Sequence, residues 1–295
     1  MLVKKKYILV VNPISGDKDK TPLLEQIYDF ANRIDIALVQ YETTGENDAK
    51  AINELFTTHQ PERIIIAGGD GTIKMVGEAL ADEAVVFGII PAGSANGLSI
   101  DLKLPTTIED NLQVAFQSDF IEIDMVAING KTSLHLSDLG LNALLVKNYE
   151  NSNTRGKLGY ALQAINTLAA SEAPFEATIE VNGDQLTFTA EMIVIANSQK
   201  YGTGVTINPN GKINDGKFEI VVLKQLNVFA IGKIVAGNIL SNTEDVTIIS
   251  TEKAIITTTK KVNFQIDGEF FGAVDRLDIS ILPAQMKVAI SNDYP

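Results

Sequence analysis

The strongest constraint on the fold is a regular alternation in the first part of the chain. Short runs that are apolar throughout are each followed by a turn and then by apolar residues spaced at i, i+3, i+4 or i+7. Strands without polar alternation are covered by helices on both faces, so the pattern predicts an open, mostly parallel α/β sheet. A ligand site is expected at the carboxyl ends of its strands. The apolar runs are Tyr7–Val11, Ile36–Val39, Ile64–Ala67 and Val85–Ile90.

The pattern changes after Asp124, where turn dipeptides separate segments of alternating polarity. Two stretches with helical spacing interrupt this part, Leu158–Ala169 and Asn227–Leu240. We expect an α/β domain over 1–127 and a β-rich, sandwich-like domain over 128–295, whose final strand is a candidate to return to the first domain. The dipeptides are Asn-Gly or Asp-Gly, which are typical of β-hairpin turns, and they occupy 129–130, 182–183, 210–211, 215–216 and 267–268.

Composition removes several classes of function. The chain of 295 residues has 37 acidic and 24 basic residues and a formal net charge of −13, and this charge repels nucleic acid. It has no cysteine, which excludes disulfides, a thiol nucleophile and thiolate metal sites. No uninterrupted apolar stretch approaches the ~18 residues of a membrane span, and the N-terminus lacks the apolar core of a signal peptide. We therefore expect a cytoplasmic protein without a transmembrane segment.

Three glycines within four residues follow the apolar run at 64–67. The sequence Gly68-Gly69-Asp70-Gly71-Thr72 leads into a stretch with helical spacing. Glycines let the main chain approach a ligand closely, and the N–H groups at a helix start attract phosphate. The local pattern therefore predicts a phosphate site, with Asp70 placed to contact a nucleotide-bound Mg²⁺. The alternative is an ordinary βα turn in which Asp70 caps the helix.

Two more polar turns follow other predicted strands of the same sheet. Asn12-Pro13-Ile14-Ser15-Gly16 follows the first apolar run, and Pro91-Ala92-Gly93-Ser94-Ala95-Asn96-Gly97 follows the fourth. Each brings a hydroxyl, an amide and glycine to an edge where strand ends converge. Either sequence alone is typical of an ordinary turn, but the three turns together predict one ligand site.

These segments resemble the three nucleotide-site motifs of the superfamily of diacylglycerol kinase and sphingosine kinase catalytic domains, in the arrangement of the small bacterial lipid kinases. The resemblance continues along the chain in the same order. Residues 208–218 are similar to the family's Asp-Gly segment, and Gln265-Ile266-Asp267-Gly268-Glu269 is similar to its C-terminal Asp-Gly-Glu. The matching motifs therefore span nearly the whole chain.

The resemblance implies an ATP-dependent kinase that transfers the γ-phosphate to a hydroxyl of a diacylglycerol-like or sphingoid-like lipid. The nucleotide is then expected in the cleft between the domains, and the protein at the membrane periphery, where it takes its lipid. Homodimerisation stays open. The residues that match the family's nucleotide contacts are Asn12, Ser15, Gly16, Thr43, Gly68, Gly69, Asp70, Gly71, Thr72, Ser94 and Asn96.

A structural Mg²⁺ is also implied by the resemblance. The family's Asp-Gly segment places this ion at Asp215, with the main-chain carbonyls of Lys212 and Lys217 as further ligands. The alternative is an Asp-Gly hairpin turn that binds no metal.

Phosphoryl transfer to a hydroxyl needs a carboxylate that takes the proton, and Asp267-Gly268-Glu269 supplies two. On an extended strand their side chains face the same side, and two carboxylates that share a site raise the pKa of one of them toward the range useful for a base. We therefore expect Asp267 to be the base, alone or paired with Glu269. Asp70 is the competing base, because the matching aspartate has that role in the sphingosine kinase branch. The alternative for Asp267 is a plain Asp-Gly turn.

The chain departs from the family pattern in two places. Lys74 and Met75 replace an Asn-Glu pair that usually follows the glycine-rich turn, and Gly97 stands where the small bacterial kinases have aspartate. Two polar groups of the expected Mg²⁺ network are missing, which keeps a non-catalytic nucleotide- or lipid-binding relative as one alternative. NAD kinase is the other, since it shares Gly-Gly-Asp-Gly-Thr and a β-rich second domain, although the Asn-Pro-x-Ser-Gly turn at 12–16 favours the lipid branch.

Overall fold

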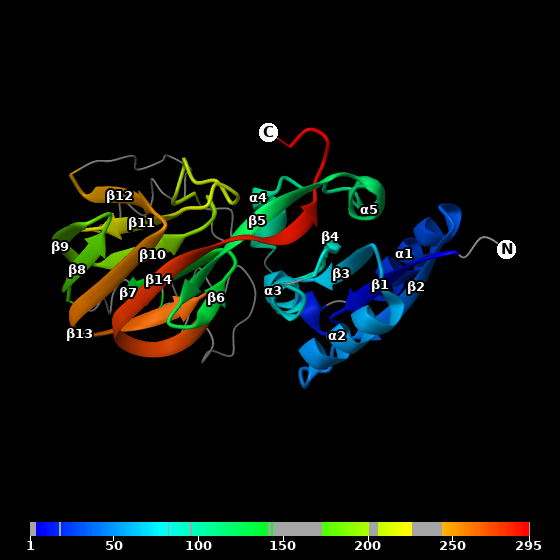
Figure 1. Ribbon diagram of the computed structural model, residues 1–295, viewed down its shortest axis with the longest axis horizontal. Helices are drawn as coiled ribbons and strands as arrows, with labels where there is room; N and C mark the ends of the chain where they lie inside the picture. The colour runs from blue at the N-terminus through cyan, green and yellow to red at the C-terminus, as the bar shows by residue number, and fades with distance from the viewer. Residues whose placement is uncertain are drawn as a thin grey trace. The chain divides into compact units, whose positions relative to one another are not determined.

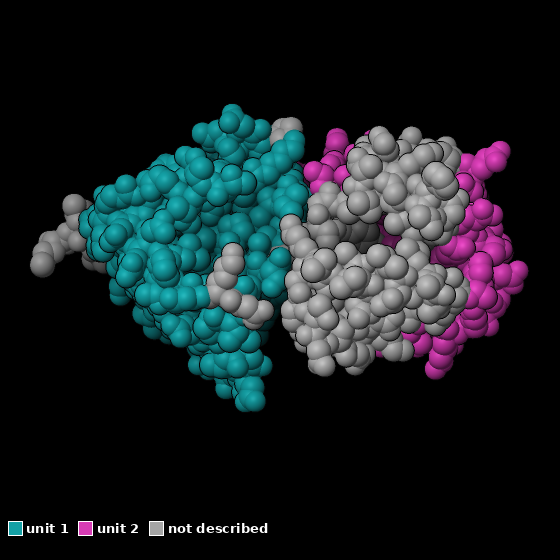
Figure 2. Space-filling view, turned by 180° about the vertical axis from the view of Figure 1, so that it is seen from behind, with its two compact units in different colours: residues 1–123, 284–295 teal, residues 124–283 magenta. Residues whose placement is uncertain are grey.

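The computed structural model describes residues 4–17, 19–81, 83–94, 96–140, 143, 173–200, 206–225 and 244–294. The chain forms two compact units, residues 1–123 with 284–295 and residues 124–283 (Figure 2). The predicted helical stretches Leu158–Ala169 and Asn227–Leu240 lie outside the described residues.

The first unit is built on a parallel sheet (Figure 1). The end of strand β14 (Glu269–Ala289) joins this sheet, because Lys287 and Val288 pair in parallel with β4. The predicted open, mostly parallel α/β domain is confirmed. Its strands lie in the order β2 (Ile36–Glu42), β1 (Lys5–Val11), β3 (Arg63–Gly68) and β4 (Val86–Pro91), and each neighbouring pair is parallel.

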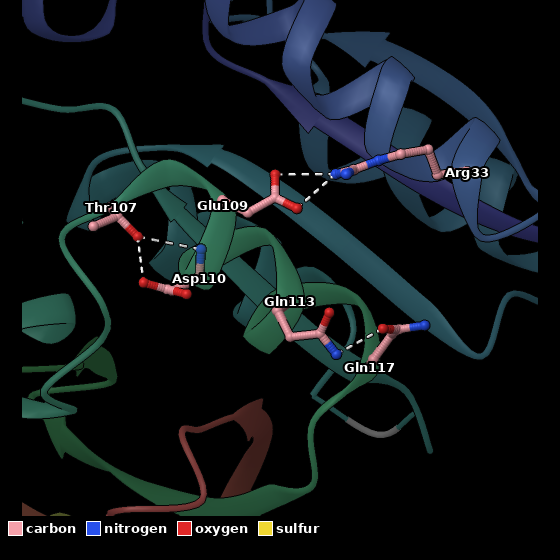
Figure 3. A network of polar contacts seen from close by, with 6 residues as sticks. All are labelled: Arg33, Thr107, Glu109, Asp110, Gln113 and Gln117. Atoms are coloured by element: carbon pink, nitrogen blue, oxygen red, sulfur yellow. Dashed lines mark hydrogen bonds and ion pairs between the residues drawn. The ribbon is translucent and has the colours of Figure 1, made fainter.

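Consecutive residues of β1, such as Ile8 and Leu9, point to opposite faces of the sheet, and both are fully buried. Both faces of this sheet are therefore covered. Phe30 of α1 and Phe116 of α5 pack with ring centroids 5.3 Å apart. Figure 3 shows a second link between these two helices, the ion pair between Arg33 and Glu109. None of the described helices is long and apolar enough to cross a membrane. The helices are η1 (Ser15–Asp17), α1 (Thr21–Arg33), α2 (Asp48–His59), α3 (Asp70–Ala79), α4 (Gly97–Asp101) and α5 (Ile108–Gln117).

The second unit is β-rich, as predicted, and every strand pair whose register is described in it is antiparallel. Strand β5 (Phe120–Ile128) leads into it from the first unit. Its core contains alternate residues of several strands, such as Ile193 and Ile195 of β10 and Ile220 and Val222 of β11. The further strands are β6 (Lys131–Ser133), β7 (Leu136–Gly140), β8 (Phe175–Val181), β9 (Asp184–Ala190), β10 (Met192–Ala196), β11 (Phe218–Leu223), β12 (Val246–Thr251) and β13 (Lys253–Ile266).

Three of the predicted turn dipeptides form two-residue hairpin connections. They join β5 to β6, β8 to β9, and β13 to β14. In each dipeptide both residues have positive φ, for example 50° at Asp267 and 88° at Gly268. Short Asn or Asp side chains followed by glycine tolerate this left-handed backbone, and the resulting twist matches that of the paired strands.

Candidate functional site

Three polar turns lie at the carboxyl ends of neighbouring parallel strands. We call residues 12–16 after β1 turn A, residues 68–72 after β3 turn B, and residues 91–97 after β4 turn C. Main-chain hydrogen bonds continue the sheet into the turns, from Asn12 N to Ala67 O at 3.1 Å and from Ala92 N to Gly68 O at 2.9 Å. The sheet order therefore brings the three predicted motifs to one edge.

Turns A and B are joined by side chains. Asn12 Nδ2 donates a hydrogen bond to Thr72 Oγ1 at 3.0 Å, and Asn12 Oδ1 accepts one from Ile14 N at 3.2 Å. Thr72 is buried against Gly68, where a Cβ would lie only 2.7 Å from the Thr72 side chain. Glycine at 68 is therefore needed for the Thr72 side chain to pack against the main chain of residue 68.

Turns A and C approach each other through their main chains. Ser15 Oγ lies within hydrogen-bond distance of Asn12 O, at 3.1 Å, and of Ala92 O, at 3.0 Å. Gly16 has φ 69°, and a Cβ there would lie 2.8 Å from Ala92 O. Glycine at 16 is therefore needed both for the left-handed backbone and for the close approach.

Lys20 also joins turns A and C, although it belongs to none of the motifs recognised in the sequence. Its side chain is buried, and Nζ donates hydrogen bonds to Ser15 O and to Ala92 O, the second at 2.8 Å. The contact to Ala92 spans 72 positions of sequence. No local pattern distinguishes this lysine from an exposed one.

Asp70 joins turns B and C. Its Oδ2 accepts a hydrogen bond from Gly97 N at 2.7 Å, and its Oδ1 accepts one from Leu98 N at 3.1 Å. These N–H groups open helix α4, so Asp70 caps the neighbouring helix rather than α3, on which it lies. Both carboxylate oxygens hold turn C in place.

Other residues matched to the nucleotide contacts lie near these turns without joining them. Asn96 closes turn C on itself, since its Oδ1 accepts from Gly93 N at 2.9 Å and its Nδ2 donates to Gly93 O at 3.1 Å. Ser94 is exposed. Thr43 follows β2, and its N donates to Val11 O at 2.9 Å. Gly71 is exposed, and apart from its chain neighbours and the backbone of its own helix no atom lies within 4 Å of a Cβ built on it.

The loop after β2 is organised by Asp48. Its carboxylate accepts hydrogen bonds from Tyr41 Oη at 2.7 Å, Thr44 N at 2.9 Å and Gly45 N at 2.8 Å. Burial raises the pKa of Asp48, but these hydrogen bonds together hold it below its usual value. The hydrogen bond to Asp48 also raises the pKa of Tyr41.

In the second unit, Asp267 occupies a hairpin turn between β13 and β14, so the expectation that it lies on an extended strand with Glu269 is wrong. Its Oδ1 accepts from Ser133 Oγ at 3.0 Å and His135 N at 2.9 Å, and its Oδ2 accepts from Leu134 N at 2.9 Å. The positive φ of the Asp-Gly turn redirects the side chain toward residues 133–135. Glu269 begins β14 and is exposed.

Asp215 is exposed, as are Lys212 and Lys217. Asp215 Oδ1 accepts a hydrogen bond from Lys217 N at 3.2 Å, the contact of an ordinary aspartate turn. Asp124, which the sequence analysis passed over, is buried and fixes this segment: its Oδ2 accepts from Gly216 N at 2.7 Å.

The donors of this segment suit Mg²⁺, which binds through one or two carboxylates and completes its shell with other oxygens. Within the described ranges, no group of three or more acidic or histidine side chains is placed to hold a metal ion. A site here therefore depends on the single Asp215 carboxylate and main-chain carbonyls.

Two family models match the chain. The diacylglycerol kinase catalytic domain matches residues 6–128, and the YegS C-terminal NAD kinase β-sandwich-like domain matches residues 138–290. The chain belongs to the diacylglycerol kinase/YegS family. Turns A, B and C all fall in the catalytic-domain match, whereas Asp215, Asp267 and Glu269 fall in the YegS C-terminal match.

Relatives of this family member include the probable lipid kinase YegS of Escherichia coli, which is 27% identical over 79% of this chain and 79% of its own length. A probable lipid kinase YegS-like of Yersinia pestis is 26% identical over 86% of this chain and 87% of its own length. The crystal structure of a diacylglycerol kinase from Bacillus anthracis aligns over 100% of both chains with a TM-score of 0.76 and 19% identity. That structure supports the fold of the YegS-family chain.

Proposed function

We propose that this member of the family is an ATP-dependent kinase that transfers the γ-phosphate of ATP to the hydroxyl of a lipid taken from the membrane surface. Membership of the diacylglycerol kinase/YegS family implies ATP as the phosphate donor. The observation that carries the proposal is the linkage of turns A, B and C at the carboxyl edge of the parallel sheet, where α/β folds bind nucleotides.

The chemistry of turn B fits the phosphates. Helix α3 begins at Asp70, and of its first turn Thr72 N donates to Gly69 O at 3.0 Å, whereas Gly71 N has no acceptor within the helix; the helix dipole favours an anion there. The Asp70 carboxylate accepts hydrogen bonds from Gly97 N and Leu98 N, so its negative charge is stabilised by these two donors. The open space beside Gly71 leaves room for a ligand to approach the main chain.

The hydroxyl and amide groups of turns A and B complete the nucleotide contacts. Asn12 and Thr72 hold each other in place, and Ser15 is fixed against turn C. In the proposal these residues orient the phosphates, and Thr43 at the end of the neighbouring strand extends the contact to the rest of the nucleotide. Preorganised donors are effective because phosphoryl transfer depends mainly on positioning and charge stabilisation.

Two kinds of Mg²⁺ belong to the proposal. Mg²⁺ that accompanies ATP neutralises charge on the transferring phosphoryl group. In the second unit, Asp215 with the carbonyls of Lys212 and Lys217 would hold a structural Mg²⁺ that fastens the 212–217 segment, next to the anchor that Asp124 provides.

Among the three carboxylates considered as the base, the hydrogen bonds favour Glu269. Asp267 accepts three hydrogen bonds, and Asp70 accepts two from the main chain. In the proposal both carboxylates therefore stabilise the local structure and do not take the proton. Glu269 is exposed, and it directly follows the rigid turn that Asp267 anchors. We propose that Glu269 takes the proton of the lipid hydroxyl and that Asp267 fixes its position.

The test is incubation of the protein with γ-labelled ATP, Mg²⁺ and separate substrates: diacylglycerol, monoacylglycerol and a sphingoid base in mixed micelles, and NAD in solution. The expected result is label in one of the lipids that depends on Mg²⁺ and is lost in Glu269→Gln. Label in NAD alone would show a NAD kinase, and ATP binding without label in any acceptor would show a non-catalytic relative. Either outcome contradicts the proposal.

A further inference from the structure

The ammonium group of Lys20 lies where turns A and C meet. Lys20 directly precedes α1, and its main-chain carbonyl accepts a hydrogen bond from Leu24 N at 2.9 Å, within the first turn of that helix. Asp19 fixes the same helix start, since its Oδ1 accepts from Thr21 N at 2.9 Å and Thr21 Oγ1 at 2.7 Å. The backbone of Lys20 is thus anchored to α1 while its side chain reaches back to turn A.

The burial of this side chain is unusual for a lysine. Lys20 is only 8% exposed, whereas lysines are almost never buried without partners, because burying an ammonium ion is costly. Its Nζ donates to the carbonyls of Ser15 and Ala92. Two carbonyl oxygens from different turns therefore converge on one positive charge.

The Lys20 ammonium contacts both of these carbonyl oxygens. Ala92 O has a second contact, with Ser15 Oγ at 3.0 Å, and the main chain at Gly16 packs directly against turn C. Replacing the ammonium with an apolar group removes the charge that holds the two oxygens close. The resulting separation would displace Ser15 and Gly16, which the proposed function places at the phosphates.

We infer that Lys20 is a positioning residue for the nucleotide, because its buried ammonium ties turn A to turn C and so fixes the Ser15–Gly16 part of the phosphate site. The inference rests on the proposed use of ATP. Lys20 acts through the turns it joins, and its positive charge also favours the polyphosphate in a protein whose formal net charge is −13.

The test compares wild type with Lys20→Met, which keeps most of the length of the side chain and removes its charge, and with Lys20→Arg, which keeps the charge and the donors. Lys50→Met is the matched control, because Lys50 lies on α2 with a side chain 78% exposed. Calorimetry measures MgATP binding without lipid, and steady-state kinetics give KM for ATP, KM for lipid and kcat. Hydrogen exchange reports the opening of turn A.

In Lys20→Met we expect ATP affinity to fall about tenfold or more, the scale of a lost hydrogen bond to a charged group. KM for ATP should rise with it, KM for lipid should stay unchanged, and the amides of turn A should exchange faster. Lys20→Arg should restore ATP affinity to within about threefold of wild type, which a loss of packing alone would not predict. Lys50→Met should match wild type.

The inference is overturned if wild type binds MgATP and folded Lys20→Met binds it with the same affinity. This result would leave the proposed function intact. Failure of wild type to bind MgATP would instead contradict the proposed function and this inference together. If Lys20→Met does not fold, Lys20→Gln, which keeps a donor and removes the charge, takes its place. Wild-type ATP affinity and turn A exchange in Lys20→Gln would likewise overturn the inference.

Discussion

At the residue scale, Asp70 contacts one of the positions at which the chain departs from the family pattern. Where the small bacterial kinases have an aspartate after Asn96, this chain has Gly97, whose N–H group donates to Asp70 at 2.7 Å. The other carboxylate oxygen of Asp70 accepts from Leu98 N, so Asp70 links turn B to turn C through hydrogen bonds to the main chain. Lys74 stands four residues after Asp70 on α3, which places the two on the same face of the helix.

The carboxylates of Asp267 and Glu269 should differ in what their removal does. Asp267→Asn leaves fewer acceptors for Ser133 Oγ, Leu134 N and His135 N, so it should lower the free energy of unfolding by about 1–3 kcal/mol. Glu269→Gln, at an exposed position, should leave stability nearly unchanged and lower kcat by about 10² or more. Chemical denaturation and steady-state kinetics on both variants measure these effects.

The opposite division of effects would contradict this assignment. If Asp267→Asn kept full stability and lost kcat, while Glu269→Gln turned over normally, the base would be Asp267. A normal kcat in both variants, with an inactive Asp70→Asn that still binds MgATP, would move the base to Asp70.

At the scale of elements, the loop between β2 and α2 depends on an ionised Asp48. Its folded-state pKa lies below the unfolded value of about 3.9, so ionisation stabilises the fold above that value and the contribution is lost as pH falls through the folded pKa. Asp48→Asn should therefore reduce the free energy of unfolding most near pH 7, and the difference from wild type should shrink toward pH 3. Denaturant titrations across this range measure it, with Glu54→Gln on the exposed side of α2 as the control. A difference that grows on acidification would contradict the account.

Helix α5 offers a separate test of local capping. Thr107 is its N-cap: Thr107 Oγ1 accepts from Asp110 N at 3.3 Å and donates to Asp110 Oδ2 at 2.5 Å (Figure 3). Thr107→Ala should lower the free energy of unfolding by about 1 kcal/mol. Gln113→Ala, which removes only the exposed contact to Gln117, should cost about 0.5 kcal/mol or less. An equal decrease in the free energy of unfolding in the two variants would contradict a specific capping contribution from Thr107.

At the scale of the whole molecule, the order and type of most described elements could be predicted because their signals are local. Apolar runs such as 64–67 and hairpin pairs such as 182–183 specify strands and turns within a few residues. The linkage of the turns could not be predicted in this way, because Lys20 and Ala92 are 72 positions apart. The expectation of an extended Asp267 is wrong for a local reason, because Asp267-Gly268 is a hairpin turn with positive φ at both residues and therefore does not continue the strand.

The central claim is that turns A, B and C form a nucleotide site, and Gly71 allows it to be tested with little effect on the fold. A Cβ at Gly71 would meet no atom within 4 Å apart from its chain neighbours and the backbone of its own helix, so we expect Gly71→Val to be accommodated while it fills the space proposed for phosphate. Valine is also a better helix residue than glycine, so the melting temperature should not fall. Thr57→Val, at an exposed position of α2, is the control.

The decisive measurement is the calorimetric affinity of Gly71→Val for MgATP beside those of wild type and Thr57→Val. The account predicts that wild type and Thr57→Val bind equally, and that Gly71→Val, with an unchanged or higher melting temperature, loses binding by about a hundredfold or more, since a blocked main-chain approach removes several hydrogen bonds to charged oxygens. Undiminished MgATP binding in a stable Gly71→Val would contradict it.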